Sequence, residues 1–105
     1  MSTYKALREL THASHRALAL AERADPADPQ FEEWRLETAR LIGRVFGFAS
    51  PYARAFNGID YEYRVGHPEM TLQERVRGFE RDMVAARALL EDMRRDLQEA
   101  ERAAL

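Results

Sequence analysis

The sequence predicts an all-α fold, a small helical bundle of three main helices plus a short linking helix, with a long heptad-patterned C-terminal helix. Apolar residues recur at spacings of three and four along three separate segments, which is the period of an amphipathic helix. Proline, glycine and asparagine interrupt the chain between these segments. No segment with the alternating period of a strand competes with them. At this length, residues 1–105 suit a single helical domain.

The first two helices are separated by a proline-rich turn. An apolar stripe predicts the first helix over Tyr4–Glu22. Asp28 is a typical N-cap for a second helix over Pro29–Phe46, because proline is well tolerated at the first helical position. Gly47 suits the position after the helix, with Phe48 folding back against it. Because this second helix is apolar over most of its circumference, we expect it to be the central element.

The rest of the chain holds the linking helix and the long C-terminal helix. A serine-proline pair predicts a short helix over Pro51–Phe56, and Asp60–Glu69 is irregular in pattern. Thr71 and Glu74 form a capping-box pattern that starts the last helix. We expect that helix to pack antiparallel to the second one. Its apolar seam follows heptad spacing and consists of Leu72, Val76, Phe79, Met83, Ala86, Leu90, Met93, Leu97 and Ala100.

The length of this seam predicts self-association. The last helix spans roughly 50 Å at about 1.5 Å per residue, whereas the first two reach only about 27–30 Å. Part of the seam therefore lacks an intrachain partner, and a second copy is the simplest cover. We predict a homodimer formed through Ala86, Leu89, Leu90, Met93 and Leu97. In the alternative, the first helix crosses the far half of the seam and hides it within one chain.

Composition argues against several classes of function. The chain has no cysteine, so thiolate nucleophiles, disulfides and cysteine-ligated metals are excluded. The net charge of −2 does not favour a nucleic-acid partner. No apolar run is long enough to span a bilayer, and the N-terminus lacks a signal-peptide pattern. We expect a cytoplasmic protein with no cofactor, no metal site and no membrane partner.

Two residue pairs on the first helix bear on catalysis. Arg8 and His15 have a spacing found in the RNase motif of a helical superfamily of prokaryotic toxin nucleases, in which Arg holds phosphate and His transfers protons. We expect these two side chains to diverge rather than converge in a cleft. Glu9 and His12 match the Glu-x-x-His element of di-iron bundles. Here His12 is expected to face water, and the further ligands such a site needs are not evident.

The irregular segment holds the most suggestive non-helical residues. Tyr61, Tyr63 and Arg64 are of the types enriched at binding hot spots, so we take them as candidate binding residues. The alternative is that the tyrosines cover the open end of the core, since loops serve both purposes.

A family resemblance covers residues 31–93. The chain resembles a small helical module that recurs in uncharacterised prokaryotic proteins, sometimes beside presumed anti-phage effector domains of TIR-like type. The residues that carry this resemblance are Phe31, Trp34, Leu41, Ile42, Phe46, Gly47, Ser50, Phe56, Ile59, Tyr61, Gly78, Phe79, Ala86, Leu89, Leu90 and Met93. Most are core or cap residues, so the resemblance implies a shared fold and a sensing, scaffolding or partner-binding role.

These observations favour a non-enzymatic protein-interaction and oligomerisation module of a prokaryotic cytoplasmic protein, associated with defence or a mobile element. Nothing in the sequence requires an enzyme. The alternative is a small helical RNase or toxin that uses Arg8 and His15. The partner expected for an interaction module is another copy of the chain, another protein, or both.

Overall fold

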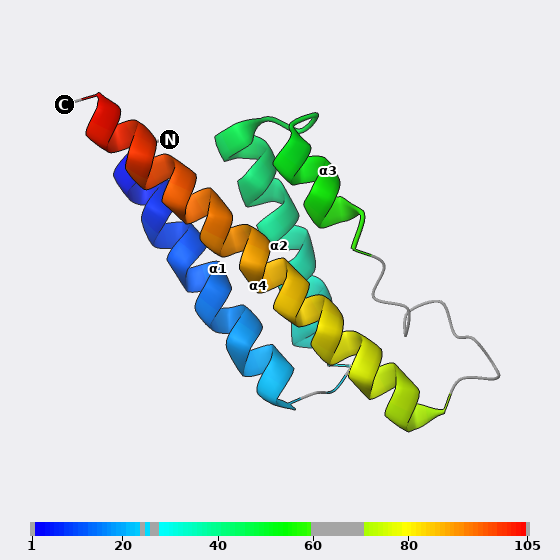
Figure 1. The fold of residues 1–105 in the computed structure, drawn as a ribbon. Helices are drawn as coiled ribbons and strands as arrows, with labels where there is room; N and C mark the ends of the chain where they lie inside the picture. The colour runs from blue at the N-terminus through cyan, green and yellow to red at the C-terminus, as the bar shows by residue number, and fades with distance from the viewer. Residues whose placement is uncertain (1, 24, 26–27, 60–70, 105) are drawn as a thin grey trace.

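The computed structural model describes residues 2–23, 25, 28–59 and 71–104 of the chain. Within them the backbone forms four helices: α1 at Thr3–Arg23, α2 at Pro29–Phe46, α3 at Pro51–Asn57 and α4 at Leu72–Ala103 (Figure 1). The described part of the chain contains no strand. The predicted all-α fold with a short linking helix and a long last helix is therefore confirmed.

Local signals fix the helix ends as the sequence predicts. Asp28 caps α2 by accepting a hydrogen bond from the Gln30 backbone N–H at 2.9 Å. The side chains of Ser50 and Thr71 do the same for α3 and α4, accepting at 3.2 Å and 3.1 Å. Gly47 ends α2 with a φ of 106°, a backbone conformation that favours glycine. Each cap satisfies a backbone group that a helix end otherwise leaves unpaired.

The helices run in alternating directions around a shared core. In Figure 1, α4 lies along α1 in the opposite direction, and the two chain ends meet at the same end of the molecule. The aromatic rings of Phe31 and Phe79 pack near the start of both α2 and α4, at 5.3 Å between centroids. Tyr52, at the start of α3, donates a hydrogen bond to Asp96 in the last third of α4. It also packs on Phe46, at the end of α2.

These contacts correct two expectations. α4 is antiparallel to α1 and runs in the same direction as α2, so the predicted antiparallel pairing with α2 is wrong. Nor is α2 the central element, because the most extensive contact between two of the described helices is that of α1 with α4.

Alanine explains why α4 pairs with α1. The side of α1 that faces the core carries Ala6, Ala13 and Ala17, and the facing position of α4 carries Ala86. All four are buried, and their small side chains allow two helix backbones to approach closely. The bulkier side chains Tyr4 and Leu18 of α1 are exposed.

α2 contributes the aromatic part of the core. Trp34 is fully buried, and its indole Nε1–H donates to the carbonyl oxygen of Ala13 in α1 at 2.9 Å. Phe31 and Phe56 pack against the indole ring, with centroid distances of 6.1 Å and 5.7 Å. The hydrogen bond thus fixes α2 to α1, and the contact between Trp34 and Phe56 fixes α3 to α2. None of the described helices combines the length and the apolar character needed to cross a membrane.

Candidate functional site

The predicted self-association residues of α4 lie inside the single chain. Ala86, Leu90 and Met93 are fully buried, and Leu89 and Leu97 are partly buried against the core. α1 covers this part of the seam, which is the alternative arrangement described above. The premise that the seam lacks an intrachain partner is therefore wrong. The uncovered end is instead the first turn of α4, where Leu72 is exposed.

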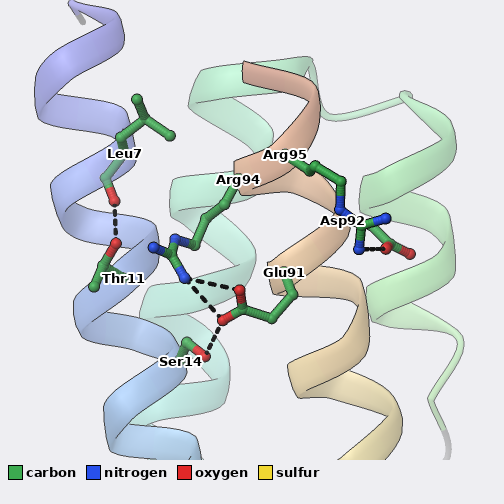
Figure 2. A network of polar contacts seen from close by, with 7 residues as sticks. All are labelled: Leu7, Thr11, Ser14, Glu91, Asp92, Arg94 and Arg95. Carbon is green, nitrogen blue, oxygen red and sulfur yellow. Dashed lines mark hydrogen bonds and ion pairs between the residues drawn. The ribbon is translucent and has the colours of Figure 1, made fainter. Parts of the chain in front are cut away.

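A polar cluster closes the α1–α4 contact beside this seam. The hydroxyl of the buried Ser14 donates to Glu91 Oε1 at 3.0 Å, and Arg94 Nη1 donates to both oxygens of the same carboxylate (Figure 2). Burial by itself raises the pKa of Glu91. The hydrogen bonds from Ser14 and Arg94 and the charges of Arg94 and Arg87 outweigh it and hold the pKa below its ordinary value. The carboxylate is satisfied by its neighbours, which is how a structural polar contact behaves.

Arg8 and His15 lie on the same side of α1. They are seven positions apart, and seven residues at about 100° each fall only about 20° short of two full turns. Both side chains are exposed. The expectation that they diverge around the helix is therefore wrong, because it misjudged this rotation. The two residues are nevertheless separated by about 10 Å along the axis, and neither lines a groove described below.

Glu9 and His12 line a groove between α1 and α2 with a volume of about 360 Å³. His12 is exposed, as its position on the helix predicts. The other side of the groove carries Arg44 and an ion pair in which Arg16 Nη1 lies 2.6 Å from Glu37 Oε2. The positive charges of Arg16 and Arg44 would repel a metal ion bound by Glu9 and His12. Across the described ranges, no cluster of three or more His, Asp or Glu side chains is placed to hold one.

The ion pair between Arg16 and Glu37 in this groove lowers the pKa of the Glu37 carboxyl. The hydrogen bond from Arg16 lowers the pKa of Glu37, and the charges of Arg16 and Arg40 act in the same direction against the opposing effect of burial. Both partners are partly accessible to water, so the pair contributes little to stability.

The side of α2 that faces away from the core carries exposed apolar residues beside the exposed charges of Glu33 and Arg40. Leu36 is 43% exposed and lies almost directly opposite the core, while Phe48 is 71% exposed just beyond the end of the helix. The ring of Phe48 folds back over Gly43, so that a Cβ added at Gly43 would overlap the ring atoms Cδ1 and Cε1. Ala39 lies between Leu36 and Gly43 along the helix, partly buried against the core. We call Leu36, Ala39, Gly43 and Phe48 the α2 outer face.

Sequence reasoning missed this surface although its signal was present. The apolar character of α2 around most of its circumference was read as evidence of a central helix, and Phe48 was assigned only to the cap. Phe48 does fold back as predicted, but it stays exposed because it lies on the outer side of the helix. The candidate binding residues Tyr61, Tyr63 and Arg64 lie outside the described residues.

Comparisons with protein-family models, with curated proteins and with solved structures gave no match to this chain.

Proposed function

We propose that this chain is a non-enzymatic protein-interaction module whose contact surface is the α2 outer face. The observation that carries this proposal is the exposure of Leu36 and Phe48 beside a core that is complete without them. Each large apolar side chain left in water lacks about 1.5–3 kcal/mol of the stabilising free energy that burial would provide. Contiguous apolar surface of this kind is typical of protein contacts.

A comparison within the molecule supports the choice of α2. Val84 on α4 is 67% exposed, but the residues one turn before it, Glu80 and Arg81, are charged and exposed. A single exposed apolar residue among charges is ordinary and needs no partner. Leu36 also has charged neighbours one turn away, Glu33 and Arg40, so the feature that distinguishes the α2 outer face is its second large apolar side chain, Phe48, which is 71% exposed just beyond the end of the helix.

Site-specific crosslinking tests the proposal. A photoreactive phenylalanine analogue is placed at Leu36, and a matched variant carries it at Val84; both chains are produced in the native host and irradiated. We expect covalent adducts to a protein from position 36 and few or none from position 84. If the two positions give the same adducts, or if neither gives any, the α2 outer face is not a contact surface.

A second candidate function is supported by the placement of Arg8 and His15 on one side of α1. With Lys5 and His12 they form an exposed row of basic and titratable residues at spacings of three and four. Such a row contacts a phosphate backbone in the way an RNase of the predicted kind requires. We rank it second because the two proposed catalytic side chains lie about two turns apart along the helix and outside the grooves.

A further inference from the structure

The charges beside the α2 outer face are segregated along the helix. Glu33 and Glu37 lie in its N-terminal half, and Arg40 and Arg44 lie in its C-terminal half. All four side chains are exposed, and all lie on the same flank of the outer face. The order along this flank is therefore acid, acid, base, base.

Interactions within the chain account for only part of this order, because Arg16 of α1 and the charge of Arg40 both favour the ionised carboxylate of Glu37. Glu33 and Glu37 are four positions apart, as are Arg40 and Arg44, and like charges at this spacing destabilise a helix slightly. The helix dipole favours acids in the first turn and bases in the last, but its effect fades in the middle, where Glu37 and Arg40 lie. A pattern of this kind is self-complementary when a second helix runs in the opposite direction.

We propose that the occupant of the α2 outer face is a second copy of this chain, bound through α2 in antiparallel orientation about a two-fold axis near residues 38 and 39. This inference rests on the proposed function, of which it specifies the partner. It places Glu33 opposite Arg44 of the second copy and Glu37 opposite Arg40 of the second copy. Because the axis is two-fold, each of these contacts occurs twice.

The same two-fold axis also matches the apolar residues. Leu36 and Gly43 lie on one line along α2, about 20° apart. In the antiparallel pair, Leu36 falls two residues, or about 3 Å along the helix, from the position opposite Gly43 of the second copy. The ring that covers Gly43 is Phe48, so Leu36 of each copy packs on the exposed face of Phe48 in the other. One placement therefore satisfies both the charges and the apolar contacts.

The area of the α2 outer face sets the affinity that we expect for the dimer. One helix face with two large apolar side chains is small compared with stable interfaces, which bury about 1,200–2,000 Å² in total. We therefore expect a weak dimer with a Kd on the order of tens to hundreds of micromolar. Light scattering should show an average mass that rises with protein concentration over the same range. Glu37 also pairs with Arg16 within its own chain, so Glu33 and Arg44 provide the cleaner test.

Charge exchange tests the pairing in the full-length protein. We expect Glu33→Arg and Arg44→Glu each to weaken dimerisation by roughly three- to tenfold, because each substitution creates two repulsive contacts. The double variant Glu33→Arg/Arg44→Glu should restore dimerisation to within about twofold. Arg54→Glu on α3 changes an exposed charge away from this surface and serves as the control. If the double variant is as weak as the single variants, this pairing is wrong.

Cysteine crosslinking tests the direction of the helices, and the absence of native cysteine makes it clean. A mixture of Glu33→Cys and Arg44→Cys chains should form a disulfide-linked pair on mild oxidation, whereas Glu33→Cys alone should not. Self-linking of Glu33→Cys would indicate parallel helices and overturn the arrangement. If wild type stays monomeric while a photoreactive group at position 36 captures a different protein, the homodimer is wrong and the proposed function stands. If neither occurs, both fail.

Discussion

Trp34 is the residue on which three helices converge. It is fully buried, and it donates to Ala13 in α1 while packing on Phe56 in α3. Truncating a buried aromatic side chain typically costs about 3–5 kcal/mol. We therefore expect Trp34→Ala to lower the Tm by at least about 12 °C.

The control for this change is Trp34→Phe, which keeps most of the apolar volume and loses the Nε1–H donor. It should fall between wild type and Trp34→Ala in a thermal unfolding measurement followed by circular dichroism. A Trp34→Ala protein that melts like wild type would contradict the burial of this side chain.

Gly43 within α2 and Gly47 at its C-terminal cap should respond to alanine in opposite ways. At Gly47 the φ of 106° is unfavourable for any residue with a Cβ, so we expect Gly47→Ala to cost about 1–2 kcal/mol of stability. At Gly43 the backbone is helical, and alanine there gains about 0.5–1 kcal/mol in helix propensity. The added Cβ displaces the exposed ring of Phe48, which can swing away.

The measurement pairs thermal unfolding with light scattering on both variants. Gly43→Ala should keep or raise the Tm and yet weaken self-association, because Phe48 leaves its place on the α2 outer face. If Gly43→Ala dimerises like wild type, the ring of Phe48 takes no part in the contact.

At the scale of the element, α4 is held along its length by α1 and near its C-terminal end by α3. Truncation after Leu90 removes the fully buried Met93, Glu91 with its hydrogen bond to Ser14, and Asp96 with its hydrogen bond to Tyr52. Loss of the buried methionine alone costs about 2–5 kcal/mol, against a total stability of about 5–15 kcal/mol for a typical domain.

We therefore expect truncation after Leu90 to abolish cooperative unfolding, instead of yielding a folded monomer. Truncation after Leu97 is the control, because residues 98–104 are all exposed. Circular dichroism melts of the two truncated chains decide the matter. A sharp transition near the wild-type Tm after removal of residues 91–105 would show that α1 does not depend on this part of α4.

The basic row on α1 separates the two candidate functions. If the chain is an interaction module, the purified Arg8→Ala and His15→Ala variants should act on RNA no differently from wild type. The measurement is incubation of labelled RNA with wild type, each variant and Arg54→Ala as a charge-matched control. Cleavage by wild type that disappears in Arg8→Ala or His15→Ala, and persists in Arg54→Ala, would reverse the ranking of the two functions.

At the scale of the whole molecule, the contacts that hold α4 in place titrate at opposite ends of the pH range. The hydrogen bond to Asp96, together with burial and the nearby charges of Asp96 and Asp92, raises the pKa of Tyr52 from 10.0 to about 12. Because the folded pKa is the higher one, this contact contributes its full stability below pH 10 and loses it as the pH rises toward 12. For Glu91 the folded pKa is lowered, so its contribution is present at neutral pH and is lost as acid protonates the carboxylate.

Matched variants isolate these two effects. The difference in Tm between wild type and Tyr52→Phe should shrink from pH 10 toward pH 12, and the difference between wild type and Glu91→Gln should shrink on acidification below the ordinary glutamate range. A constant difference across the alkaline range would show that Tyr52 does not donate to Asp96 in solution.

The sequence by itself determined the class of fold and the ends of the helices. These features depend on groups a few positions apart: Asp28 on Gln30, Thr71 on Glu74 and Gly47 on Gly43. Hydrophobic spacing likewise identified Phe79, Met83 and Leu90 as core residues of α4. Capping and helical period act within one or two turns, so no knowledge of distant segments was needed.

Only the tertiary structure decided which helix covers which, and hence which surface is left open. The alanines of α1 carry little weight in a hydrophobic pattern, yet they lie buried in the most extensive contact between the described helices, which buries the seam at Leu90 and Met93. Among the side chains that stay exposed are Leu36 on the outer side of α2 and Phe48 just beyond its end. Burial is a property of pairs of helices, and a pattern along one helix does not specify its partner.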